Sequence, residues 1–235
     1  PAKQARILAE GARLVVGGAR YADALAASQA HAASTGAIQV HAYDHPDVLA
    51  GQGTVALEWQ QDAPELTHVL GAVGGGGLIG GMAGWYAGSA AIIAVEPASS
   101  PALHAALAAG RPVDVEVGGV AADSLGARQV GDLMFPIAAA HVAQSVLVAD
   151  DAIIAAQRWL WAECQVVAEP GGATALAALL SGAWVPPPGA RVGVLVCGGN
   201  CAPGSVAAGS VAPGSVAPGA GIPGAGDPGA HGARG

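Results

Sequence analysis

The chain has 235 residues, of which 52% are hydrophobic and 11% are charged. This length allows one large domain or two small ones with a sizeable buried core. The net charge is −8 and the nine basic residues are scattered singly, so no basic cluster can follow a nucleic-acid backbone or an anionic membrane surface. We therefore expect neither a nucleic acid nor a membrane as a partner.

Helix and strand patterns alternate along the chain. Apolar residues at helical spacing predict helices, and short continuous apolar runs predict strands. Helices are expected at residues 2–11, 21–35, 44–61, 77–88, 100–110, 150–165 and 171–182. Strands are expected at residues 12–18, 37–43, 67–73, 90–96 and 190–199. The alternation, with fully apolar strands, predicts an α/β fold in which helices cover both faces of parallel sheets.

Two stretches differ in composition from the rest. Residues 202–235 repeat Gly-Ser-Val-Ala with almost no large apolar side chain, which predicts a low-complexity disordered tail. Residues 69–95 contain no charge and are long enough to span a bilayer. Nine of them are glycine, however, and glycine weakens a helix. We expect a buried strand, turn, helix and strand there and no membrane span.

The three cysteines are Cys164, Cys197 and Cys201, an odd number without a paired metal-ligand pattern. Cys197 and Cys201 are four residues apart, but no second pair or nearby histidine completes a zinc site. A reducing compartment, the cytoplasm, is the simplest location for such a chain.

Four consecutive glycines, Gly74 to Gly77, stand between a predicted strand and a predicted helix. Free backbone N–H groups and the helix dipole favour an anion at such a place, and a phosphate is the first candidate. A tight turn with close helix packing is the alternative, although a turn needs fewer glycines. Gly75, Gly77 and Gly80 also fit the dinucleotide pattern Gly-x-Gly-x-x-Gly, with Glu96 placed to bind a ribose. An NAD-binding dehydrogenase is therefore one interpretation.

Four motifs favour another interpretation: "AGQGT" at 50–54, "GGGGL" at 74–78, "EPGGA" at 169–173 and "CGGN" at 197–200. In this order and spacing, the chain resembles the pyridoxal-phosphate enzymes that include threonine dehydratase, serine dehydratase and serine racemase. The resemblance implies fold type II, with part of a small domain at residues 1–40 and the large cofactor-binding domain at residues 41–201.

The resemblance also implies a reaction. The complete protein would deaminate L-threonine or L-serine by β-elimination, giving 2-oxobutyrate or pyruvate and ammonia. It would use pyridoxal 5'-phosphate, take a small amino acid as substrate and form a homo-oligomer. A serine or aspartate racemase of the same fold is the nearest alternative, because both reactions begin with loss of the α-proton.

The resemblance assigns the cofactor phosphate to the loop formed by Gly74, Gly75, Gly76, Gly77 and Leu78. Cys197 is implied to meet the pyridine nitrogen, and a neutral partner there leaves that nitrogen unprotonated. Taken alone, Cys197 could be a small buried apolar residue at a strand end. Glu169 is implied to form a wall of the site, with a helix N-cap as the alternative. Tyr43 is implied to lie beside the cofactor, or else to be an ordinary half-buried aromatic residue.

The lysine that forms the Schiff base is missing. In the family it belongs to a Ser-x-Lys-x-Arg-Gly-Ala segment upstream of the point where this chain begins, and the only lysine here is Lys3. We therefore expect an N-terminally truncated fragment with no catalytic residue of its own and no activity by the family mechanism.

Some relatives bind a divalent cation near the glutamate that corresponds to Glu96. Here the further ligand positions hold Ser100, through its carbonyl, and Ala102 in place of an aspartate. One carboxylate makes a weak magnesium site, so no metal is expected.

Overall fold

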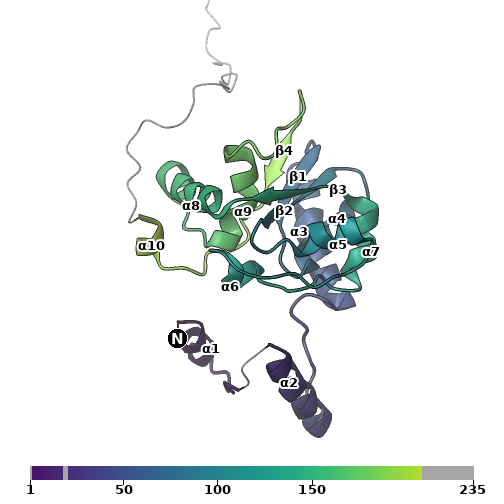
Figure 1. Ribbon diagram of the computed structural model, residues 1–235, viewed down its shortest axis with the longest axis vertical. Helices are drawn as coiled ribbons and strands as arrows, with labels where there is room; N and C mark the ends of the chain where they lie inside the picture. Colours follow the sequence, from purple (N-terminus) through teal and green to yellow (C-terminus); the bar gives the residue numbers. More distant parts are fainter. Residues whose placement is uncertain (1, 18–20, 208–235) are drawn as a thin grey trace, which may run out of the picture.

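A computed structural model describes residues 2–17 and 21–207 (Figure 1). Its helices are α1 (Ala2–Ala9), α2 (Tyr21–Thr35), α3 (Pro46–Asp62), α4 (Gly77–Tyr86), α5 (Ala102–Ala109), α6 (Ala122–Leu125), α7 (Met134–His141), α8 (Asp150–Cys164), α9 (Pro170–Leu180) and α10 (Pro203–Ala207). Its strands are β1 (His68–Ala72), β2 (Ala91–Pro97), β3 (Val142–Val148) and β4 (Val192–Val194). Within the described ranges, no helix is both long and apolar enough to cross a bilayer.

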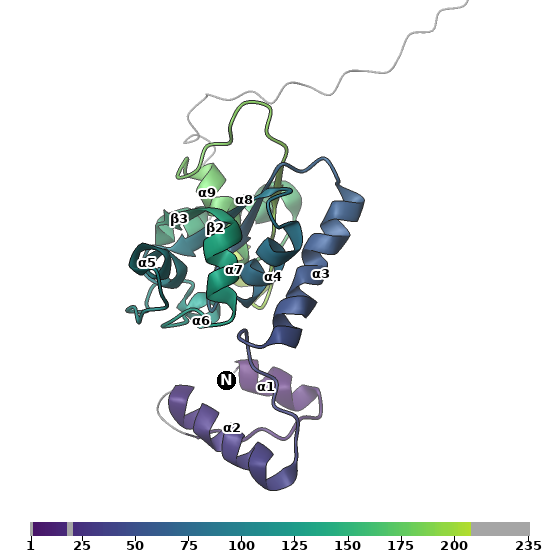
Figure 2. The ribbon, with the colours of Figure 1, turned by 90° about the vertical axis from the view of Figure 1, so that its right-hand side faces the viewer.

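The four strands form one parallel sheet in the order β3-β2-β1-β4. Successive side chains of a strand point to opposite faces, and the two central strands show this directly. Val69 and Ile92 belong to one apolar cluster, whereas Leu70 and Ile93 belong to the other. The first cluster joins the sheet to α3, α4, α5 and α7, and the second joins it to α8 and α9 (Figures 1 and 2). The predicted parallel α/β fold with helices on both faces is confirmed.

Helices α1 and α2 lie apart from this body and are joined to α3 by an extended segment (Figure 2). The strands predicted at residues 12–18 and 37–43 are wrong for the described residues, which have no regular structure there. Ile38 and Val40 are 92% and 80% exposed. A strand needs a neighbour to pair its N–H and C=O groups, and the described residues offer none to these segments. The division at residue 40 stays a prediction.

The sequence patterns missed α6, α7 and β3. Strand β3 lies at the sheet edge and carries polar Gln144 and Ser145, which interrupt the apolar run expected of a buried strand. Strand β4 is shorter than residues 190–199. The segment predicted to be disordered begins with α10, whose Val206 is 4% exposed, and residues 208–235 lie outside the described ranges.

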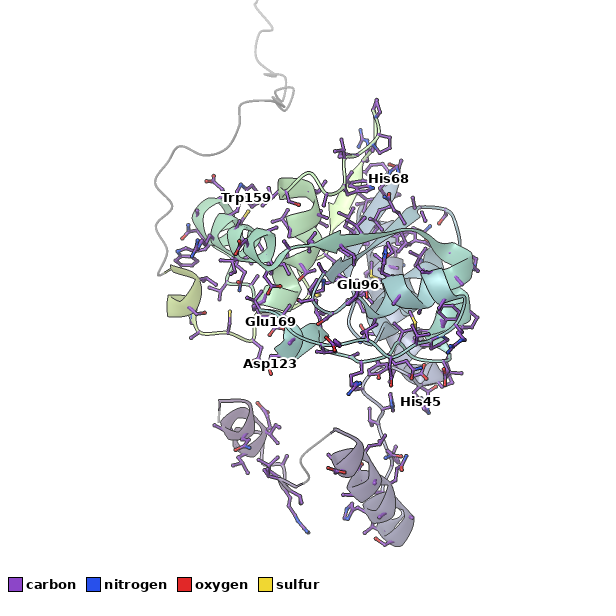
Figure 3. All side chains as sticks on the ribbon, viewed as in Figure 1. His45, His68, Glu96, Asp123, Trp159 and Glu169 are labelled. Carbon is purple, nitrogen blue, oxygen red and sulfur yellow. The ribbon has the colours of Figure 1, made fainter. Side chains whose placement is uncertain are left out.

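Glu96, at the end of β2, is fully buried and holds the start of α5 (Figure 3). Its two carboxylate oxygens accept hydrogen bonds from the backbone N–H groups of Leu103 at 2.7 Å and His104 at 2.8 Å. The hydroxyl of Ser145 donates to it at 3.5 Å. Burial raises the pKa of Glu96 from 4.5 to about 7, against the lowering effect of these hydrogen bonds. The carboxylate is therefore a structural cap and faces neither solvent nor the glycine loop.

The buried carboxyl group predicts a specific pH dependence of stability. The folded chain binds the Glu96 proton more tightly than the unfolded chain does. Its contribution to the free energy of unfolding is therefore present below pH 4.5 and declines as the pH rises to about 7. The decline is at most about 3 kcal/mol. Glu96→Gln should remove this decline, as measured by urea unfolding at a series of pH values.

Glu58→Gln, at an exposed position of α3, is the matched control and should keep the wild-type pH dependence. If Glu96→Gln and wild type show the same dependence on pH, the carboxyl group does not titrate as described.

Candidate functional site

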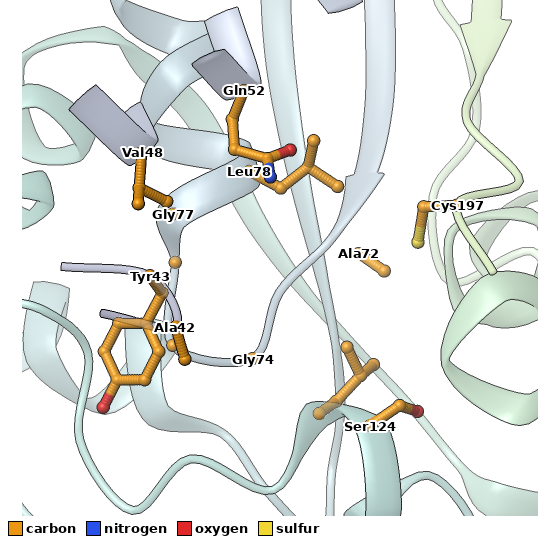
Figure 4. Close-up of a pocket in the computed structure, with 13 residues that line it drawn as sticks. Ala42, Tyr43, Val48, Gln52, Ala72, Gly74, Gly77, Leu78, Ser124 and Cys197 are labelled. Atoms are coloured by element: carbon orange, nitrogen blue, oxygen red, sulfur yellow. The ribbon is translucent and has the colours of Figure 1, made fainter. Parts of the chain in front are cut away.

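A pocket of about 260 Å³ opens at the carboxyl ends of β1 and β4 (Figure 4). From β1 the chain connects to β2 on one side, while β4 pairs with β1 on the other, so the strand order reverses here. Ligands of open α/β sheets bind at this kind of switch point. The lining residues are Ala42, Tyr43, Val48, Gln52, Ala72, Gly74, Gly75, Gly76, Gly77, Leu78, Ser124, Leu125 and Cys197.

The glycine loop brings the N-terminus of α4 to this pocket. Gly76 is the N-cap with φ +92°, in the left-handed region that glycine occupies readily, and no side chain caps the helix. The N–H groups of the first turn, beginning at Gly77 and Leu78, have no acceptor within the helix. Together with the helix dipole they favour an anion at the pocket.

The same glycines are closely packed on the side where a Cβ atom would lie. A Cβ on Gly75 would overlap the ring of Tyr43, and one on Gly77 would lie 2.8 Å from the carbonyl oxygen of Tyr43. A Cβ on Gly76 would lie 2.5 Å from the terminal methyl of Met134. The loop is thus fixed between Tyr43 and Met134 by the protein itself, and its backbone faces the pocket without side chains.

Cys197 lies across the pocket from this loop, just after β4 (Figure 4). Its thiol donates a weak hydrogen bond to the carbonyl of Gly171, with 3.9 Å between sulfur and oxygen. The residue is exposed at the pocket, but the atoms around its sulfur desolvate it and raise the pKa of the thiol. The carboxylate of Glu169 raises that pKa further. At neutral pH, Cys197 is therefore a protonated, uncharged thiol.

Glu169 is the one predicted site residue that does not line the pocket. It occupies the N-cap position of α9, yet its side chain makes no capping hydrogen bond. Its backbone N–H donates to the carbonyl of Gly198 at 3.0 Å, and a Cβ on Gly198 would overlap its carboxylate. Glu169 therefore lies behind the loop that carries Cys197 and acts on the thiol through its charge.

Two polar lining residues, Gln52 and Ser124, were not among the predicted site residues. Gln52 comes from α3 and belongs to the motif "AGQGT", which carried a signal but no role. Ser124 comes from the four-residue helix α6, which no sequence pattern indicated. The roles of all lining residues as cofactor ligands stay predictions.

Residues 1–198 match the sequence profile of a family described as "Pyridoxal-phosphate dependent enzyme". The chain belongs to this family. The resemblance that the four motifs indicate is confirmed, and so is fold type II, through the solved structures of similar proteins.

Among curated proteins, the chain is 38% identical over 172 residues to a biosynthetic L-threonine dehydratase of Salmonella typhimurium, a match covering 72% of this chain and 34% of that protein. It is 34% identical over 193 residues to the L-threonine ammonia-lyase of Thermotoga maritima, covering 81% of this chain and 48% of that protein. The chain thus spans about a third to a half of these relatives.

Among solved structures, maize serine racemase superposes with a TM-score of 0.81 at 29% identity, covering 88% of this chain and 65% of that one. A bacterial-type threonine deaminase, from the organism abbreviated T.th., superposes with a TM-score of 0.79 at 32% identity, covering 86% of this chain and 68% of that one.

The pocket suits the cofactor of this family. One end offers N–H groups at a helix N-terminus for a phosphate dianion, and the other offers an uncharged thiol for a pyridine nitrogen. Its volume of about 260 Å³ is small for a dinucleotide. Glu96, which the dehydrogenase interpretation needs for a ribose, is buried and bonded to α5. The dehydrogenase interpretation therefore has no support at either end.

The metal question also turns on Glu96. Both of its carboxylate oxygens accept backbone hydrogen bonds, and within residues 2–17 and 21–207 no three His, Cys, Asp or Glu side chains group as a metal site.

The packing of the glycine loop predicts that Gly77→Ala weakens binding of pyridoxal phosphate by at least about tenfold, because the new Cβ must displace the backbone of Tyr43. Gly84→Ala in the same helix is the matched control, since its Cβ would meet Ile137 at an ordinary 3.5 Å. That variant should keep the affinity and gain stability from the better helix former. Fluorescence titration with pyridoxal phosphate measures both affinities, and equal values would contradict the prediction.

The state of Cys197 predicts its reactivity. The thiolate is the nucleophile, so the raised pKa should make Cys197 react with iodoacetamide more slowly than the exposed Cys164. Pyridoxal phosphate should slow Cys197 further and leave Cys164 unchanged. Peptide mass spectrometry over time measures both rates, and equal protection of the two cysteines would argue against cofactor contact at Cys197.

Proposed function

We propose that this chain is the cofactor-binding part of an ammonia-lyase that deaminates L-threonine or L-serine by β-elimination. The products are 2-oxobutyrate or pyruvate, together with ammonia. The observation that carries this proposal is the pairing of a helix N-terminus without a side-chain cap and an uncharged thiol at opposite sides of one small pocket. The identity to threonine dehydratases and ammonia-lyases over most of the chain supports the choice of reaction.

Each end of the pocket has a distinct task in this proposal. When bound, pyridoxal phosphate supplies an electron-withdrawing ring that stabilises negative charge at the α-carbon of an amino acid. The first turn of α4 binds the phosphate dianion through charge-assisted hydrogen bonds. Cys197 keeps its proton on Sγ and leaves the pyridine nitrogen uncharged. Gln52 and Ser124 bring an amide and a hydroxyl to the pocket, where they orient polar groups of the ligands.

The chain itself supplies no catalytic residue in this proposal. Removal of an α-proton in this family needs a lysine amine, and the only lysine is Lys3. Lys3 belongs to α1, outside the elements that form the pocket. Because the chain spans only part of its relatives, the activity is proposed for the complete protein.

A serine racemase is the second candidate. The superposition on maize serine racemase favours it, and elimination and racemisation both begin with loss of the α-proton.

A homo-oligomer and a cytoplasmic location stay predictions. All three cysteines are free, which supports a reducing compartment. Apolar side chains at Val15, Val16, Ile38 and Val40 are at least 70% exposed, which supports a further protein surface that covers them.

The test compares the 235-residue chain with the product of the whole open reading frame around the Pro1 codon. We expect the chain alone to bind pyridoxal phosphate, to form no borohydride-reducible adduct above background, and to make no 2-oxobutyrate from L-threonine. The complete product should make 2-oxobutyrate, measured with a coupled lactate dehydrogenase assay.

Two outcomes would overturn the proposal. Formation of D-serine from L-serine without oxoacid would establish the racemase. Oxoacid production by the chain alone would show that the lysine is not required.

A further inference from the structure

A histidine outside the lining of the pocket organises the turn that leads to the glycine loop. Nδ1 of the half-buried His41 accepts hydrogen bonds from the backbone N–H groups of Tyr43 at 3.2 Å and Asp44 at 2.8 Å. Both donors are backbone amides, so Nδ1 must carry a lone pair and the ring proton lies on Nε2. The rings of His41 and Tyr43 also meet edge to face, with centroids 5.0 Å apart.

Two arms extend from this turn to the glycine loop. The first is Tyr43, whose ring packs on Gly75 and whose backbone packs on Gly77. The second is Asp44, whose carboxylate accepts hydrogen bonds from the N–H groups of Asp132 and Leu133, both at 3.0 Å.

The second arm reaches the glycine loop through Gly131. The N–H of Gly131 donates to the carbonyl of Gly75 at 3.0 Å, and a Cβ on Gly131 would overlap Asp44. Gly75 is therefore held from two sides by contacts that both begin at the His41 turn.

We propose that His41 is a positioning residue for the phosphate end of the cofactor. It fixes the turn that holds Tyr43 and Asp44 against the glycine loop, and it touches neither the pocket nor the ligand. This inference rests on the proposed cofactor site. Its physical reason is preorganisation: four consecutive glycines have more backbone freedom than any other residues, so a loop that the protein has already ordered binds its anion more tightly.

The test uses the full chain and two ligands that differ only in the phosphate, pyridoxal 5'-phosphate and pyridoxal. The measured quantity is the ratio of their dissociation constants, by fluorescence titration, with a thermal melt for each variant. Wild type should prefer the phosphorylated ligand. His41→Ala should reduce that preference by about tenfold, since two backbone hydrogen bonds and the ring contact are lost.

Two further variants separate positioning from general stability. His41→Asn should recover most of the preference, because an asparagine oxygen accepts the N–H two residues ahead in a turn of this kind. His45→Ala is the matched control: Nδ1 of His45 also accepts a backbone N–H two residues ahead, that of Asp47 at 3.3 Å, but its ring does not contact the glycine loop. It should leave the preference unchanged.

A double-mutant cycle tests the route through Tyr43. Tyr43→Ala should lower the preference about as much as His41→Ala, and the double variant should lose little more than either single one. If His41→Ala does not fold, the Tyr43→Ala and His41→Asn variants still decide the matter.

An unchanged preference in His41→Ala, or a full loss in His41→Asn, would overturn the inference. A wild-type chain that binds both ligands equally would instead overturn the phosphate site itself, before any variant is compared.

Discussion

The start of helix α4 is the constraint on which the site depends. The helix follows β1 directly, in the middle of a parallel sheet, and begins at Gly76 without a side-chain cap. Unpaired N–H groups at a helix start favour an anion, and the sheet brings them to the edge where β1 and β4 diverge. Every other lining residue is placed relative to this point, including Cys197 after β4 and Gln52 on α3.

An uncapped glycine start has a cost that the surrounding structure offsets. Each glycine loses more backbone freedom on folding than any other residue, roughly 0.5 to 1 kcal/mol relative to alanine. The loop is ordered by contacts that only glycine permits: Tyr43 against Gly75, Met134 against Gly76, and the backbone of Leu125 at 3.0 Å from a Cβ on Gly74. The absence of side chains thus serves both close packing behind the loop and open access in front of it.

The sequence predicted what local pattern and motif order can carry. The β1 strand, the glycine loop and helices α8 and α9 follow from apolar periodicity, and Tyr43 and Cys197 were placed at the pocket by resemblance. Strand β3 was missed because an edge strand tolerates Gln144 and Ser145. The strand at residues 37–43 was wrong because pairing depends on a neighbour that no local pattern reveals. Gln52 and Ser124 meet Cys197 only through tertiary packing, which sequence spacing does not encode.

Charge distribution also gives the pocket a direction. The start of α4 carries the positive end of a helix dipole, whereas the opposite side carries an uncharged thiol with the carboxylate of Glu169 behind it. A phosphate dianion beside Cys197 would meet that carboxylate and would lose the helix N–H groups. A neutral ring nitrogen at the same place meets no such repulsion. The two ends therefore discriminate between the two orientations of a phosphorylated pyridine, and the same carboxylate that keeps the thiol protonated also excludes the phosphate from its side.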